Sequence, residues 1–186
     1  MYNVLEVVRF PDPVLITPVK KVVEFNGYVV NLITQMIETM NRLDGVGLAA
    51  NQVGIPLAIF VMKDRKDNWI CINPTIKSTF GNTLSLEGCL SSPGKPAMVR
   101  RPTKLELTYQ DVLGEFHEVY VTDKHLVSII SHEMDHLNGI SILDYCKHKH
   151  CMCNFTKHRG GNISIEQAHG LKDLGNKLGT GDLIRK

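Results

Sequence analysis

The stretch "DKHLVSIISHEMDHLNG", residues 123–139, has the pattern of a buried helix that carries polar chemistry on one face. Its apolar residues recur at the three-and-four spacing of a helix packed on a core, namely Leu126, Val127, Ile130, Met134 and Leu137. Asp123 can cap the first turn, and Asn138 with Gly139 supplies a stop. The stretch therefore predicts one core helix around which the remaining elements are arranged.

The motif "HEMDH", residues 132–136, indicates a metal site on that helix. Residues four apart on a helix lie about 5 to 6 Å from one another, so His132 and His136 can reach one ion. A bound ion lowers the pKa of its water to roughly 7, and the carboxylate of Glu133 can then take and return a proton. This is the general logic of HExxH hydrolases.

The third ligand stays open on the residues alone. A metzincin would place a histidine at position 142, where this chain has Ile142. Glu166 would complete the site of another zincin type and would make the protein an endopeptidase. Cys89, in "LEGCLSSPG", is the other candidate, although a lone cysteine is more often a small buried hydrophobe.

The rest of the chain predicts an α+β fold, with antiparallel or mixed strands packed around the central helix and with N- and C-terminal helices. The spacing of apolar residues predicts a helix over 28–43. Short apolar runs predict strands at 57–62 and 69–72, and 82–102 reads as bends around an exposed strand. Two alternating runs within 104–122 predict a hairpin.

Composition bounds the function without naming it. The 186 residues suit one compact domain, and a net charge of +2 without basic-aromatic clusters disfavours nucleic-acid binding. We expect a catalytic domain over 1–146 and a Cys/His-rich extension over 147–186, whose spacing fits no standard zinc module. With no evident leader or membrane span, and an odd number of cysteines, we expect a cytoplasmic protein.

Three motifs together resemble the peptide deformylase family. They are "GVGLAANQ" (45–52), "EGCLS" (87–91) and "HEMDH", in this order along the chain. The opening "VLEVVRFPDPVLITPV" is also similar to the N-terminal segment of that family, so the resemblance runs from about residue 4 to about residue 145. The combination is much more specific than the HExxH pattern alone.

The resemblance implies that Cys89, His132 and His136 hold one divalent ion per chain. Iron(II) is the expected ion, and zinc, nickel or cobalt can replace it. The reaction would remove the formyl group from the N-terminal methionine of new polypeptides: hydroxide on the ion attacks the formyl carbon, and Glu133 is general base and acid. Gln52 and the Leu90 N–H would stabilise the oxyanion.

The resemblance also implies where the substrate lies. Gly45, Val46 and Gly47 would let a peptide pair with the main chain, and Arg101 would help position it. Ser128 and Ile129 would line the pocket for the first side chain, where Ser128 and His125 are more polar than the family pattern, although an exposed His125 is the simpler reading.

Formyl-methionyl nascent peptides are the implied substrates, and the ribosome, near the exit of the nascent chain, is a candidate partner. No direct nucleic-acid site and no membrane contact are expected. A second alternative, from a different class, is a silent domain that keeps the metal and binds peptides without turnover.

Overall fold

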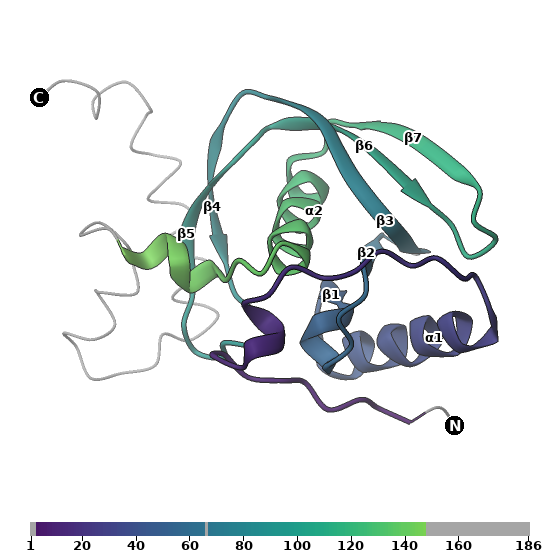
Figure 1. Cartoon of the computed structure of the whole chain (residues 1–186). Helices are drawn as coiled ribbons and strands as arrows, with labels where there is room; N and C mark the ends of the chain where they lie inside the picture. The colour runs from purple at the N-terminus through teal and green to yellow at the C-terminus, as the bar shows by residue number, and fades with distance from the viewer. Residues whose placement is uncertain (1–2, 66, 148–186) are drawn as a thin grey trace, which may run out of the picture.

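The computed structural model describes residues 3–65 and 67–147, and within this part the chain forms an α+β fold with two α-helices (Figure 1). The elements in chain order are η1 (Pro13–Leu15), α1 (Gly27–Arg42), β1 (Gly47–Ala49), η2 (Ala50–Val53), β2 (Ile59–Asp64), β3 (Asp67–Phe80), β4 (Thr83–Glu87), β5 (Ala97–Arg101), β6 (Lys104–Gln110), β7 (Phe116–Val121), α2 (Lys124–Leu137) and η3 (Ile142–Lys147). Here η denotes a short 3₁₀-helix. The predicted α+β class is confirmed.

Five strands form one sheet in the order β1-β2-β3-β6-β7, with every neighbouring pair antiparallel. The long β3 pairs with β2 along its first half and with β6 along its second half. Strands β4 and β5 form a separate two-stranded sheet. The chain enters and leaves this small sheet between β3 and β6, which brings the turn after β4 toward α2.

Strand β2 is buried on both faces over residues 59–62 because a helix packs on each side of it. In β2, Ile59 and Val61 pack into a cluster with residues of α1, whereas Phe60 and Met62 pack into a cluster with residues of α2. The continuous apolar run of this strand follows from that position, since successive side chains of a strand point to opposite faces. Figure 1 shows α1 and α2 on the two sides of the strands.

The helix α2 begins and ends where the sequence predicts. The Asp123 side chain accepts hydrogen bonds from the backbone N–H groups of His125 (2.8 Å) and Leu126 (3.3 Å). Gly139 follows the C-cap with a φ of 73°, and a Cβ there would lie 2.8 Å from the backbone carbonyl carbon of Ile16. The motif at 132–136 therefore lies in a well-defined helix that packs on the sheet.

Two segments of the chain contain more β-strand than the sequence predicts. The strand expected over 69–72 is the start of β3, which runs for 14 residues. Asn73 has a positive φ of 50° and Pro74 lacks an N–H, so the register shifts between Ile72 and Thr75 before pairing with β6 resumes. The segment expected to hold one exposed strand forms both β4 and β5, and Glu87, Ala97, Val99 and Arg101 are buried.

The first helix begins only at Gly27, after an N-terminal arm whose one helical turn is η1. The arm's main chain bonds to other segments instead, for example from the Lys20 N–H to the Pro56 carbonyl (2.9 Å). The expected C-terminal helix, over 163–179, lies outside the described residues, as does nearly all of the predicted extension over 147–186. In the described part, no helix has the length and apolar character needed to cross a bilayer.

Candidate metal and active site

Three side chains with metal-ligating atoms converge beside α2. The ligand atoms of Cys89, His132 and His136 all lie within 4.8 Å of one another. The Cys89 Sγ lies 3.2 Å from the His136 Nε2, and both histidines are buried. Cys89 lies two residues beyond the end of β4, in a turn closed by the Ser92 N–H, which donates to the Cys89 carbonyl (3.0 Å).

The chemistry of this donor set fits a divalent cation. Imidazole and thiolate are ligands that iron, zinc, nickel and cobalt accept, and three protein ligands leave a position for a reactant. Burial lowers the pKa of His132, but hydrogen bonds with Cys89 and Glu87 outweigh burial and raise it to about 10. Burial and the neighbouring His132 lower the pKa of His136 to about 3. The neighbouring groups therefore favour a positive charge on His132 and a neutral imidazole at His136.

Glu87 orients the first histidine of the motif. Its Oε2 lies 3.0 Å from the His132 Nδ1, which leaves the Nε2 of that ring to face the ligand group. Burial alone would raise the pKa of Glu87, yet hydrogen bonds from Arg101 and His132 lower it to about 2. Glu87 is consequently a carboxylate, and it accepts a further bond from the Ser128 hydroxyl (2.8 Å).

Arg101 lies behind this carboxylate, between Glu87 and Asp135. Its side chain is 4% exposed. The Nε and Nη2 donate to the two oxygens of Glu87 (2.9 and 2.8 Å), and the Nη1 donates to Asp135 (2.6 Å). The two carboxylates therefore enclose the guanidinium, and a role of Arg101 in positioning substrate stays a prediction. The ring of Tyr145 covers it, 5.3 Å from the Arg101 Cζ to the ring centroid.

The Glu133 carboxylate is buried next to the ligand group and meets β1. A Cβ on Gly47 would lie 2.3 Å from the Glu133 Oε1, so only glycine leaves room for this carboxylate. Burial raises the pKa of Glu133 to about 7. Its Oε2 has no hydrogen-bond partner among the described residues. The group has the features of a general base or acid, which works best with a pKa near the working pH.

The Gln52 side chain points its amide nitrogen at the ligand group. Its Oε1 accepts a hydrogen bond from the Ala49 N–H (2.9 Å), which sets the orientation of the amide. The Nε2 lies 3.5 Å from the Cys89 Sγ and 3.3 Å from the Ser91 Oγ. Leu90 follows Cys89 in the same turn, so the structure brings both expected oxyanion donors to the segments that border the metal ligands.

The expected peptide-binding segment forms the edge of the five-stranded sheet. Lys63 donates its N–H to the Val46 carbonyl (2.9 Å), and Gly47 is the next residue in register with β2. Because alternate residues of an antiparallel strand point their polar groups in opposite directions, the N–H and C=O of Gly47 face away from β2. Gly45 lies beside Leu90, since a Cβ on it would be 3.0 Å from the Leu90 Cδ1.

The two residues expected at the first side-chain pocket have different surroundings. Ile129 is buried beside Gly47, with its Cγ2 3.0 Å from where a Cβ of that glycine would lie. The Ser128 hydroxyl bonds to Glu87 and lies 2.7 Å from the Ser85 hydroxyl, on β4. The helix surface between β1 and β4 is thus apolar at one position and polar at the other. His125 is exposed in the first helical turn.

Sequence reasoning missed several residues that support the site, chiefly Glu87, Asp135 and Asn51. Glu87 stands two residues before Cys89, and its position inside the "EGCLS" motif was the one available signal. Asn51 donates to the His136 carbonyl (2.6 Å) across 85 residues of sequence. A partner so distant along the chain leaves no local pattern from which it could be predicted.

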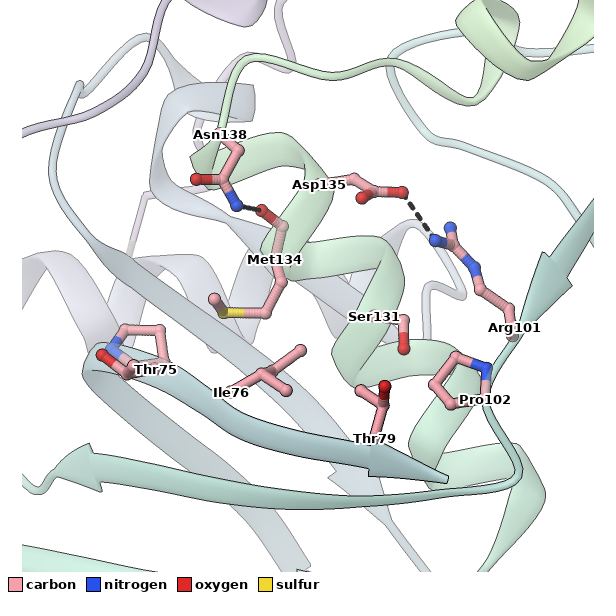
Figure 2. A pocket seen from close by; sticks show the side chains of 10 residues that line it. Thr75, Ile76, Thr79, Arg101, Pro102, Ser131, Met134, Asp135 and Asn138 are labelled. Atoms are coloured by element: carbon pink, nitrogen blue, oxygen red, sulfur yellow. Dashed lines mark hydrogen bonds and ion pairs between the residues drawn. The ribbon is translucent and has the colours of Figure 1, made fainter. Parts of the chain in front are cut away.

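A cavity lies on the other face of α2. Figure 2 shows this pocket, a cavity of about 470 Å³ whose lining includes Thr79 of β3, Pro102, and Ser131, Met134, Asp135 and Asn138 of α2. The Arg101–Asp135 ion pair forms part of its wall. Among its lining residues are none of the three ligand residues or Glu133. This cavity and the ligand group are therefore separate features.

Comparisons with known proteins show the family of this chain. The sequence pattern of the family described as Polypeptide deformylase matches residues 4–151. A peptide deformylase of Dictyoglomus turgidum is 40% identical over 141 residues, which cover 76% of this chain and 92% of that protein. Two crystal structures superpose well. The peptide deformylase of Thermotoga maritima has a TM-score of 0.74 at 37% identity and covers 76% of this chain and 97% of its own. That of Synechococcus elongatus with actinonin has a TM-score of 0.77 at 34% identity and covers 88% of both chains.

Proposed function

This chain belongs to the polypeptide deformylase family, hydrolases that remove N-formyl groups from nascent peptides, and we propose that a metal ion held by Cys89, His132 and His136 supports this reaction here. The observation that carries the proposal is the convergence of these three ligand atoms next to the buried carboxylate of Glu133. The zincin alternative would need Glu166, which lies outside the described residues.

We propose iron(II) as the native ion, with zinc, nickel or cobalt as replacements. Imidazole and thiolate ligands bind all four metals, and availability in the cell then decides which is loaded. When bound, the ion would polarise the formyl carbonyl and lower the pKa of a water molecule. Protein purified without oxygen should contain about one ion per chain, which elemental analysis of the full-length protein can measure.

Glu133 moves the proton. Its Oε2 has no hydrogen-bond partner among the described residues, so it can accept a proton from the attacking water. The same carboxyl group then gives the proton to the leaving nitrogen of methionine. Formate and a free amino terminus are the products. The role needs a carboxyl group that ionises near neutral pH, as burial provides for Glu133.

Gln52 and Leu90 stabilise the formyl oxygen as it gains negative charge. The Gln52 Nε2 is aimed by the bond between its Oε1 and Ala49, and the Leu90 N–H comes from the turn that carries Cys89. Donors held in place before the reaction lower the barrier because they need not reorganise; removal of one costs about 3 to 4 kcal/mol in comparable sites.

The peptide would add to the edge of the sheet at Gly45, Val46 and Gly47, because the polar groups of Gly47 face away from β2. Its first side chain would then lie against α2 at Ile129 and Ser128. We also propose that Arg101 fixes Glu87, which in turn orients His132.

The substrates are formylated nascent peptides, and we propose that the enzyme meets them near the ribosomal exit. The formyl group is at the amino terminus, which emerges first. Co-sedimentation of the full chain with ribosomes would test this partner separately from the chemistry.

The deciding experiment measures formate released from a formyl-Met tripeptide by anaerobically purified protein. The acetylated peptide is the substrate control, and Glu118→Ala, at an exposed glutamate of β7, is the variant control. Glu133→Ala should keep its metal and lose on the order of a hundredfold or more in rate. Glu118→Ala should match the wild type.

Formate release that depends on Glu133 and spares the acetylated peptide would establish the proposal. If metal-loaded wild type binds the peptide without releasing formate, the chain is a peptide-binding domain without catalytic activity. Cleavage inside the peptide would instead identify a protease.

A further inference from the structure

The N-terminal arm crosses the two segments that carry the proposed oxyanion donors. The Val8 N–H donates to the carbonyl of Gln52 (2.8 Å), and the Phe10 N–H donates to the carbonyl of Ser91 (3.0 Å). Gln52 belongs to η2, and Ser91 belongs to the Cys89–Ser92 turn after β4. Two residues of one extended arm therefore tie together main-chain segments that are about 40 residues apart in sequence.

Arg9, between these two residues, reaches the same turn with its side chain. Its Nη1 donates to the carbonyl of Leu90. The turn is closed internally by the Ser92 N–H on the Cys89 carbonyl, and the arm holds the next two carbonyls from outside. The two peptide groups that flank Leu90 are thus held by the Ser92 bond within the turn and by the Arg9 bond from the arm, and the Phe10 bond holds the next peptide group.

The same turn also contacts the other donor. The Gln52 Nε2 lies 3.3 Å from the Ser91 Oγ and 3.5 Å from the Cys89 Sγ, so a tilt of the turn would change the surroundings of this amide. Both donors must point at one oxygen, and a displacement on the order of 1 Å can cost about a hundredfold in rate. The bonds from the arm therefore hold the positions of the two donors, which the rate depends on.

We propose that Arg9 is a positioning residue that holds the Cys89–Ser92 turn in the orientation in which the Leu90 N–H and the Gln52 amide act together. The proposal rests on the proposed function, since it needs these two donors to serve the formyl oxygen. Arg9 is the member of the arm whose contact can be removed without altering the backbone. It is exposed, so its loss should affect the rate more than folding.

The test compares Arg9→Ala, Arg9→Lys and Arg100→Ala with wild type, all metal-loaded. Arg100 is a matched control because it is also exposed and donates to one partner, the Asn82 side chain (2.8 Å). For Arg9→Ala we expect kcat to fall about tenfold with KM within about twofold, since the contact serves the transition state. Metal content should be unchanged, and Tm should move by less than about 4 °C.

Arg9→Lys should recover most of the lost kcat, because an ammonium group can still donate to one carbonyl. Arg100→Ala should match wild type. A kcat for Arg9→Ala equal to that of active wild type would overturn the positioning role and leave the deformylase function intact. Loss of metal or a large fall in Tm in Arg9→Ala would also overturn it, because the residue would then be structural. If wild type itself releases no formate, the proposed function and this inference both fall.

Discussion

The two faces of α2 differ in whether their polar atoms have partners. On the ligand face, the Glu133 Oε2 and the His136 Nδ1 are buried without a hydrogen-bond partner among the described residues. On the other face, the Asp135 Oδ2 accepts from Arg101 and from the Tyr145 hydroxyl, although that face borders a cavity of about 470 Å³ (Figure 2). Buried polar atoms are normally hydrogen-bonded, so an unpaired one points to a functional site. Here the unpaired atoms indicate the proposed active site better than the size of the cavity does.

Replacing Arg101 should have the largest effect on both faces of α2. Its guanidinium bonds to Glu87, which contacts the ligand face, and to Asp135 on the other face. Arg101→Ala would leave the buried Glu87 and the half-buried Asp135 without their cation, and we expect the free energy of unfolding to fall by about 3 to 5 kcal/mol. Urea denaturation measures the loss, and Arg100→Ala serves as the exposed control. A loss below about 1 kcal/mol would mean that solvent or another group replaces the guanidinium.

Gly47→Ala should damage the ligand face alone. The new Cβ would lie 2.3 Å from the Glu133 Oε1 and would push the carboxylate away. We expect kcat to fall on the order of a hundredfold, the size of a general acid or base contribution, with metal content retained. Gly27→Ala is the control, since a Cβ there meets nothing within 4 Å. Equal rates for the two variants would show that Glu133 tolerates the shift.

Ser128→Val tests the ligand face at a residue that is not a proposed metal ligand. The Ser128 and Ser85 hydroxyls lie 2.7 Å apart and give the proposed side-chain pocket a polar wall. We expect the preference for formyl-methionine over formyl-methionine sulfoxide peptides to rise about tenfold, judged by the ratio of kcat/KM values. This ratio is insensitive to the lost hydrogen bond on Glu87. An unchanged ratio would place the first side chain elsewhere.

Thr79→Leu should have the smallest effect. Thr79 lines the cavity on the opposite face and is exposed, so an apolar side chain there would fill space without reaching the ligand group. We expect kcat/KM to stay within about twofold of wild type. A fall beyond about fivefold in a folded protein would show that the two faces are coupled through the Arg101 ion pairs.

The sequence predicts well those features that repeat along one element. The apolar spacing of α1 and α2 and the cap at Asp123 need only local residues, and each is confirmed by the structure. The family resemblance, expected from residue 4 to about 145, matches residues 4–151. Short motifs were enough to predict the family because its characteristic residues lie in a few contiguous stretches of sequence.

Features that depend on distant partners could not be predicted. Arg101 has its partners 14 and 34 residues away, and neither spacing belongs to a helix or a strand ladder, so the sequence indicated only a substrate role or a solvated surface charge. The full length of β3 could not be predicted because Asn73 and Pro74 interrupt the strand pattern. The strand continues beyond them because it pairs with β6, which is distant in the sequence. The roles of the individual site residues stay predictions until the variants are measured.

The dispersal of the site along the chain bears on the order of events in folding. Arg9 bonds to Leu90 across 81 residues, and Asn51 bonds to His136 across 85. Such contacts close large loops, whose entropic cost is met before the contact contributes, and they slow folding. The turn with Cys89 and the helix with both histidines must meet before a metal can bind all three. Helix α2 is the last regular secondary structure of the sheet core to be synthesised, so the centre of the enzyme can be completed only after nearly all of the described chain exists.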